Sequence, residues 1–263
     1  MRDRLWRHWP EYLMEAAGLG LFMIVAAACA SILEHPASPV RQAVPDPLLR
    51  RVLMGVAMGA TSIALVYSPM GARSGAHLNP ATTLTFYRLG RVHSVDAAAY
   101  VVAQCAGGLV GIGVAALLLS PWIAAPSVHY VATSPGPWGT LAALGAEVGI
   151  TFVLMTVVLH VSNHPRWSPY TGLCAGGLVC LYIALEAPVS GMSLNPARSL
   201  GPAILTREFG TLWIYGAGPL TGMLLAAEAF VRGFGLGAVR CAKLHHHTAA
   251  RCIFHCRFGA HQS

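Results

Sequence analysis

The sequence predicts an all-α membrane protein with six transmembrane helices and two re-entrant half-helices arranged as an inverted repeat. Three observations predict this fold class. First, 55% of the 263 residues are hydrophobic and only 10% are charged, whereas about a quarter of the residues are charged in a soluble domain. Second, the apolar residues form runs long enough to cross a hydrocarbon core of about 30 Å. Third, the stretch Ser74–Ala81 recurs as Ser190–Ala197, with Ser, Gly, Leu, Asn, Pro and Ala unchanged.

The apolar runs divide the chain into a head at 1–11, a membrane domain at 12–231 and a tail at 232–263. Six spans are expected in the membrane domain: Tyr12–Leu33, Leu48–Tyr67, Val95–Leu119, Thr140–Val161, Tyr170–Leu185 and Phe209–Val231. Half-helices are expected at Pro80–Tyr87 and Pro196–Thr206. Asn followed by Pro is typical of a helix start, because Asn caps free N–H groups and Pro has no N–H to leave unsatisfied.

The two halves of the membrane domain have the same order of elements, which predicts repeats over about 12–119 and 140–231. Each repeat begins with a span that carries a glutamate near its start, Glu15 in the first and Glu147 in the second. A second span, a half-helix and a third span follow in both. Half-helices that begin inside the membrane, one in each repeat, are typical of channels and transporters built from inverted repeats.

The basic residues predict the orientation of the chain in the membrane. Six spans place both termini on one side, together with twelve of the 17 Arg and Lys residues. The opposite side holds the other five, Arg41, Arg50, Arg51, Arg198 and Arg207. Basic residues are enriched in cytoplasmic loops, so both termini are expected in the cytoplasm.

The net charge of +7 is concentrated in the termini and loops, so no nucleic-acid partner is expected. Sixteen Arg against one Lys favours a GC-rich bacterial source, and hence a bacterial plasma (inner) membrane.

The tail is rich in cysteine and histidine. The residues are Cys241, His245, His246, His247, Cys252, His255, Cys256 and His261. Such tracts can bind metal. No tetrahedral zinc spacing is clean here, since Cys252 and Cys256 are separated by three residues with His255 beside one of them, and no metal site is predicted. A basic cytoplasmic tail that contacts anionic lipid is favoured, and a metal-responsive gate is the alternative.

The paired triplets Asn79-Pro80-Ala81 and Asn195-Pro196-Ala197, in this order of spans, resemble the aquaporin, or major intrinsic protein, family. The resemblance covers about 11–231. It includes Arg198 directly after the second triplet, Gln104 in the third span and Gly218-Pro219 in the sixth. The resemblance implies a passive channel for water or small neutral solutes such as glycerol. It also implies a homotetramer with one pore per subunit in a lipid bilayer, no cofactor, no bound metal and no catalytic residues.

The physics of the paired half-helices agrees with a channel that excludes protons and ions. A helix N-terminus carries about half a positive charge, so two such ends inside the membrane repel cations. The Asn79 and Asn195 side-chain amides can donate hydrogen bonds to a passing solute. Irregular backbone at membrane depth is tolerated where it lines a water-filled path. The residues expected to line the pore with their backbone are Gly75, Ala76, His77, Gly191 and Ser193. By resemblance, Glu15 and Glu147 brace the two loops.

A selectivity filter is expected at four positions. Arginine inside a membrane is costly and usually functional, and pore arginines exclude cations, which points to Arg198. Counting along the family pattern places the other positions at Met192, Ile183 and Met58, with Gly59 as the alternative to Met58. By the same resemblance, water-selective members usually carry His where this chain has Ile183. An apolar filter that also passes glycerol is therefore expected.

Three other function classes are weighed. A channel for another uncharged solute with little water flux would use the same residues. An ion-coupled transporter would need acid pairs inside the membrane, for which Glu15, Glu147 and Glu186 are the candidates. A membrane enzyme would need clustered catalytic groups, whereas His77 and His160 stand alone in the sequence.

Overall fold

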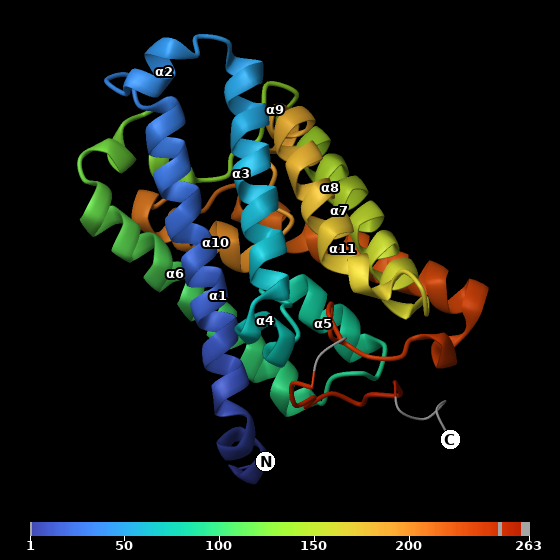
Figure 1. Ribbon diagram of the computed structural model, residues 1–263. Helices are drawn as coiled ribbons and strands as arrows, with labels where there is room; N and C mark the ends of the chain where they lie inside the picture. Colours follow the sequence, from blue (N-terminus) through green and yellow to red (C-terminus); the bar gives the residue numbers. More distant parts are fainter. Residues whose placement is uncertain (1, 247–248, 259–263) are drawn as a thin grey trace.

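The computed structural model describes residues 2–246 and 249–258, which form a bundle of long helices around two short ones, α5 and α10 (Figure 1). Six helical segments of the described chain are long and apolar enough to cross a membrane. The long helices are α1 (Arg2–Glu34), α3 (Pro47–Tyr67), α6 (Ser94–Leu119), α7 (Gly139–Asn163), α8 (Thr171–Leu185) and α11 (Leu212–Phe234). A 3₁₀ turn, η3 (Ser168–Tyr170), leads into α8 and belongs to the fifth span.

The contacts between helices show the inverted repeat. Helix α1 packs on α6, and its counterpart α7 packs on α11. The half-helix α5 (Pro80–Arg88) packs on α11 of the other repeat, and α10 (Pro196–Thr206) packs on α6. Helices α3 and α8 contact each other and complete the ring. Each half-helix is therefore held by a long helix from the opposite half of the chain.

Small residues allow the long helices to approach closely. At Gly107 of α6, a Cβ atom would overlap the Ala16 carbonyl of α1. At the corresponding Gly222 of α11, it would overlap the Val148 carbonyl of α7. Membrane helices associate through such small-residue contacts, because lipid supplies no hydrophobic force between them. The matching positions show that both repeats use the same packing device.

The head expected at 1–11 is not a separate segment, because α1 begins at Arg2 and continues without a break. The Asp96 side chain at the start of α6 receives hydrogen bonds from Arg4 Nη1 at 2.9 Å and from the Tyr12 hydroxyl at 2.7 Å. Arg4 contacts Asp96 Oδ2 and Tyr12 contacts Oδ1, and His8 Nδ1 lies 2.8 Å from the same Oδ1 atom. These contacts hold the first three turns of α1 against the bundle.

The expected ends of the other spans agree with the structure to within a few residues. The second half-helix has the expected bounds, and the first ends one residue later, at Arg88. Three short helices and the 3₁₀ turns lie in segments expected to be loops. The additional elements are α2 (Pro39–Ala43), α4 (Pro69–Ser74), α9 (Ala187–Ser190), η1 (Trp122–Ala124), η2 (His129–Val131) and η4 (Leu236–Ala238). Helices α4 and α9 precede the two Asn-Pro-Ala loops in equivalent places.

The C-terminal segment, defined here as residues 239–258 where described, packs against the bundle at the end where the chain begins (Figure 1). Its apolar side chains join the core that also contains Phe86 and Tyr100. The buried residues of this segment are Val239, Cys241, Ala242, Lys243, Leu244, Ile253 and Phe254. The sequence did not indicate this packing, and contact of the tail with anionic lipid stays a prediction. His247 and His261 lie outside the described residues.

Candidate pore

Two loops enter the bundle before the half-helices, and their backbones have the same unusual conformation. Residues with positive φ occur in the same pattern in both: Gly75, Ala76 and Leu78 in the first loop, and Gly191, Met192 and Leu194 in the second. Positive φ is uncommon outside glycine and costs about 1–3 kcal/mol per residue unless the surroundings enforce it. Contacts from other elements must therefore hold both loops in place.

The first loop is held by Glu15 of α1. Its carboxylate accepts hydrogen bonds from the backbone N–H of His77 at 3.1 Å and of Leu78 at 2.5 Å. The Ser74 hydroxyl donates at 2.7 Å and the Gln104 amide at 2.8 Å. Glu15 is fully buried, and its oxygens are satisfied by groups that belong to the loop and to α6.

The second loop is held in the same way by Glu147 of α7. The backbone N–H groups of Ser193 and Leu194 donate at 2.7 and 2.9 Å, and the Ser190 hydroxyl donates at 2.8 Å. In both repeats, one buried carboxylate thus accepts from a serine and from two consecutive N–H groups of the strained loop. The equivalence extends the inverted repeat from helices to individual hydrogen bonds.

The two loops meet through the asparagines that begin the half-helices. Asn79 Nδ2 donates to the Leu194 carbonyl at 2.8 Å, and Asn195 Nδ2 donates to the Leu78 carbonyl at 2.7 Å. The Oδ1 atoms cap their own helices, since Asn79 accepts from Ala81 N at 2.9 Å. Asn195 caps α10 by accepting from the next N–H groups, at 3.0 and 3.3 Å. Each amide thereby commits one of its two N–H bonds to the opposite loop and keeps one for a ligand.

A cavity of about 340 Å³ follows both loops. Its lining extends from Glu34 at the end of α1 to Leu244 in the C-terminal segment, and it includes Asn79, Asn195 and Arg198. Most of the other lining side chains are aliphatic or methionine. An apolar passage with a few convergent polar groups suits small molecules that are uncharged.

The sequence model of the major intrinsic protein family matches residues 4–230. The chain belongs to this family. It is 34% identical over 213 residues to "Aquaporin NIP1-3" of Oryza sativa subsp. japonica, covering 81% of this chain and 70% of the relative. It is 32% identical over 217 residues to "Nodulin-26" of Glycine max, covering 82% and 75%. Among solved structures, the aquaglyceroporin from Plasmodium falciparum superposes with a TM-score of 0.66 at 21% identity, covering 85% of this chain and 95% of that one.

In this major intrinsic protein, four residues expected in the filter line the cavity. Arg198, Met192, Ile183 and Met58 all contribute to its lining. Gly59, the alternative to Met58, instead faces α8, where its Cβ position lies 2.6 Å from the Gly176 carbonyl. Met54, one turn along α3 from Met58, also lines the cavity and was not expected there.

Arg198 and Arg51 both line the cavity, and Arg51 Nε donates to the Ala184 carbonyl at 3.4 Å. Arg198 is the one that belongs to the second loop and its half-helix. Its Nη1 atom is buried, and within the described residues it has no hydrogen-bond partner. Arg198 is the third residue of α10, which begins directly after the N-cap Asn195, so the start of the helix fixes the position of its backbone. A buried guanidinium donor without a protein partner is suited to donate to a solute.

His77 has both a pore position and a structural role. It lines the cavity, but its ring nitrogens are occupied, with Nδ1 3.0 Å from Thr83 Oγ1 and Nε2 2.8 Å from the Ala242 carbonyl. His160 lies near the end of α7 and bonds to the Thr156 carbonyl of its own helix. The expected backbone-lining residues Ala76, Gly191 and Ser193 line the cavity, whereas Gly75 faces the C-terminal segment.

Sequence reasoning missed two tyrosines that fix the loops. The Tyr100 hydroxyl donates to the Ser74 carbonyl at 2.6 Å, and the Tyr215 hydroxyl donates to the Ser190 carbonyl at 2.7 Å. Tyr100 lies four residues before Gln104, and Tyr215 lies four residues before Pro219. Comparison of the third span of each repeat would have shown this match.

Proposed function

We propose that this chain passes water and small neutral solutes of about the size of glycerol along the cavity between the two loops. Membership in the major intrinsic protein family makes it a channel, and not an enzyme. The observation that carries the proposal is the reciprocal contact of Asn79 and Asn195. That contact joins two capped helix N-termini beside a continuous cavity, with one donor on each amide available to a solute.

The proposed selectivity filter consists of Arg198, Met192, Ile183 and Met58. Arg198 supplies hydrogen-bond donors for a hydroxyl or water oxygen, and its charge opposes cations. The other three side chains are apolar and supply no donor that would favour water over a polyol. Methionine side chains are flexible, so the filter can adapt to the carbon face of a small solute.

The proposed role of Glu15 and Glu147 is to brace the loops. Both carboxylates bond to the loops and to neighbouring groups, and neither is among the residues that line the cavity. An ion-coupled transporter would need a carboxylate exposed to the passage, which neither Glu15 nor Glu147 supplies; Glu34, at the end of α1, lines the cavity but is paired with Arg50.

The proposed orientation has both termini in the cytoplasm, in a bacterial plasma membrane. The start of α1 and the C-terminal segment lie at one end of the bundle (Figure 1), and the expected excess of basic residues is on that side.

We also propose a homotetramer with one pore per subunit. Large apolar side chains such as Leu117 and Leu141 are exposed on the outer faces, where they would meet lipid or neighbouring subunits.

The test is stopped-flow light scattering on proteoliposomes that contain the purified protein. Osmotic water flux and glycerol entry are both expected to exceed those of empty liposomes. Fast water flux with glycerol excluded would contradict the proposed wide filter. Solute entry without water flux would instead indicate a channel for another uncharged solute.

A substitution in the filter makes the proposal sharper. Ile183→His adds a polar ring to the cavity wall, so glycerol entry is expected to fall about tenfold while water flux changes less. Leu185→His is the matched control, because Leu185 lies on the same helix with its side chain exposed outside the cavity. Equal effects of the two substitutions would contradict a filter role for Ile183.

A further inference from the structure

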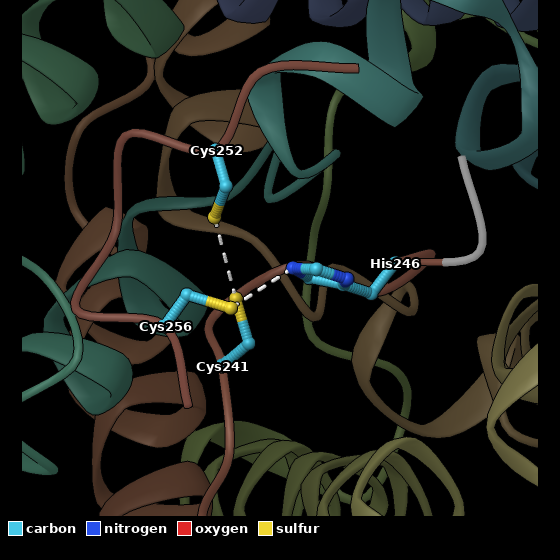
Figure 2. Close-up of side chains that lie close together, drawn as sticks. All are labelled: Cys241, His246, Cys252 and Cys256. Carbon is cyan, nitrogen blue, oxygen red and sulfur yellow. Dashed lines mark hydrogen bonds between the residues drawn. The ribbon is translucent and has the colours of Figure 1, made fainter. Parts of the chain in front are cut away.

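Four metal-ligating side chains converge in the C-terminal segment, and together they are called the Cys₃His cluster. The cluster consists of Cys241, His246, Cys252 and Cys256 (Figure 2). Their candidate ligand atoms all lie within 4.8 Å of one another. The Cys241 and Cys252 sulfurs are 3.6 Å apart, and Cys256 Sγ lies 3.0 Å from His246 Nε2. The four residues occur within 16 positions of the chain. Three residues separate Cys252 from Cys256, which is a usual spacing for two zinc ligands, but Cys241 and His246 do not complete a usual zinc motif.

The donor set and its dimensions suit one ion of the zinc class. Structural zinc sites are tetrahedral and are commonly formed by three thiolates and one imidazole. A metal–sulfur distance of about 2.3 Å places tetrahedral sulfurs about 3.8 Å apart, close to the separation of Cys241 and Cys252. Thiolate and imidazole ligands favour zinc over magnesium or calcium.

The loop between the first two ligands lies directly on the first pore loop. Leu244 N donates to the Gly75 carbonyl at 3.1 Å, and the Ala242 carbonyl lies 2.8 Å from His77 Nε2. Lys243 Nζ donates to the Ala72 carbonyl at 2.7 Å. Leu244 also forms part of the cavity lining. Three consecutive residues bracketed by Cys241 and His246 therefore cover one end of the cavity.

The loop between the other two ligands reinforces the same contact. Phe254, which lies between Cys252 and Cys256, stacks on the His77 ring with centroids 5.3 Å apart. Lys243 Nζ also donates to the carbonyls of Ala250 and Arg251, at 3.1 and 2.7 Å. These bonds tie together the two parts of the segment that carry the ligands.

We propose that the Cys₃His cluster binds one zinc-class divalent cation, and that the bound ion holds the C-terminal segment across the pore mouth as a plug. Binding exchanges thiol protons for the metal ion and involves no oxidation. With the ion removed, the segment keeps only its hydrogen bonds and apolar contacts, and it leaves the mouth more often. The effect on flux rests on the channel function proposed above, whereas metal binding does not.

The first experiment measures metal binding to the full-length protein in detergent. One zinc ion per chain is expected at micromolar free zinc, and cobalt substitution is expected to produce thiolate-to-cobalt charge-transfer absorption. The double variant Cys252→Ser/Cys256→Ser and the single variant His246→Ala are expected to lose this binding or weaken it. Cys105→Ala, which removes a cysteine of α6 outside the cluster, and His245→Ala, next to the ligand His246, are the matched controls.

Two results would overturn the metal site. One is failure of the wild type to bind a single zinc ion, which needs no variant to be interpreted. The other is an intact mass two hydrogens lighter that returns to normal with reductant, together with a peptide map that locates the disulfide between Cys241 and Cys252.

The second experiment measures water flux in proteoliposomes before and after a membrane-permeant zinc chelator. Chelation is expected to raise wild-type flux by about threefold or more, because removal of the ion shifts the equilibrium from plugged to open channels. The His246→Ala variant is expected to show the higher flux from the start and no response. Zinc binding with flux unchanged by chelation would overturn the plug. If the protein binds zinc in detergent but shows no flux in proteoliposomes either before or after chelation, the proposed channel function would be overturned instead.

Discussion

Single buried carboxylates set the conformation of the pore loops. In each repeat, one glutamate accepts from two consecutive backbone N–H groups at the point where the chain has positive φ. Those N–H groups lie away from water, so they would otherwise be unsatisfied at a cost of about 1–3 kcal/mol each. The strain of the loop and the burial of the carboxylate are thus compensated by the same hydrogen bonds.

Replacement of Glu147 by Gln is expected to lower the stability of the folded protein by about 1–3 kcal/mol. Whichever way the amide turns, its NH₂ group faces a donor, Ser193 N or Leu194 N. A fall in the melting temperature in detergent, together with reduced solute flux, is the expected measurement. Glu228→Gln is the control, since Glu228 forms only exposed ion pairs with Arg88 and Arg232. A melting temperature as high as that of the control would argue against bracing.

Glu186 predicts a dependence of stability on pH. It follows the fifth span, and burial raises its pKa from 4.5 to about 7, against the smaller lowering effect of Ser190. A carboxyl with a higher pKa in the folded chain binds its proton more tightly when folded. Stability is therefore expected to fall as the pH rises from about 4.5 to 7 and then to level off. Melting curves of Glu186→Gln should lack this part of the decline, and an unchanged pH profile would contradict the argument.

At the level of helices, close packing in matching places holds the two repeats together. Gly107 and Gly222 occur at the same contact in each repeat, where backbone of one helix lies against backbone of its neighbour. At either site, the Cβ atom of any other residue would overlap the backbone of the neighbouring helix.

Gly107→Ala is expected to destabilise the protein by about 1–3 kcal/mol, because the added methyl group must push α6 away from α1. Gly113→Ala, six residues further along the same helix, has nothing within 4 Å of the new carbon. That control is expected to leave the melting temperature unchanged or slightly higher, since alanine is the better helix former. Similar losses in both variants would show that helix propensity, not packing, decides the effect.

The six spans and both half-helices could be predicted because each has a local sequence signal. The signal is an apolar run for each span and Asn-Pro for each half-helix. The bracing of α1 against Asp96 was not predictable, since it joins residues far apart in the sequence. Helices α4 and α9 were missed because each is shorter than two turns and lies in a Pro-containing loop. The start of α1 contacts Asp96, and the C-terminal segment packs apolar side chains into the core of the bundle. Both sets of contacts join residues far apart in the sequence, so neither could be predicted.

For the pore, the sequence indicated Asn79, Asn195 and Arg198 through the repeated motif. The family pattern also predicted Met58, Ile183 and Met192 as the other positions of the proposed filter, and all three line the cavity. The contact of Leu244 with the first loop could not be predicted, because its partner Gly75 lies in the other half of the chain. The same holds for the Cys₃His cluster, whose four ligands are brought together by the packing of the C-terminal segment and not by a recognisable spacing.

For the whole molecule, the arrangement of the half-helices predicts that the channel does not conduct protons. Two helix N-termini and the Arg198 guanidinium face the same passage, and both oppose cations. In proteoliposomes loaded with a pH-sensitive dye, an imposed pH gradient is expected to decay no faster than in empty liposomes. The same preparation must show water flux, so that intact channels are present. Fast decay of the gradient would contradict the proposed arrangement.

The exchange of half-helices between repeats also bears on how the chain is made. Half-helix α5 is synthesised early, but the helix on which it packs, α11, is the last of the long helices to leave the ribosome. Until α11 is inserted, α5 has only the contacts with its own repeat, such as those with α6, and lacks those with α11. The two halves are thus bound to mature together, and a chain cut between the repeats should regain its structure only when both fragments are made in the same cell.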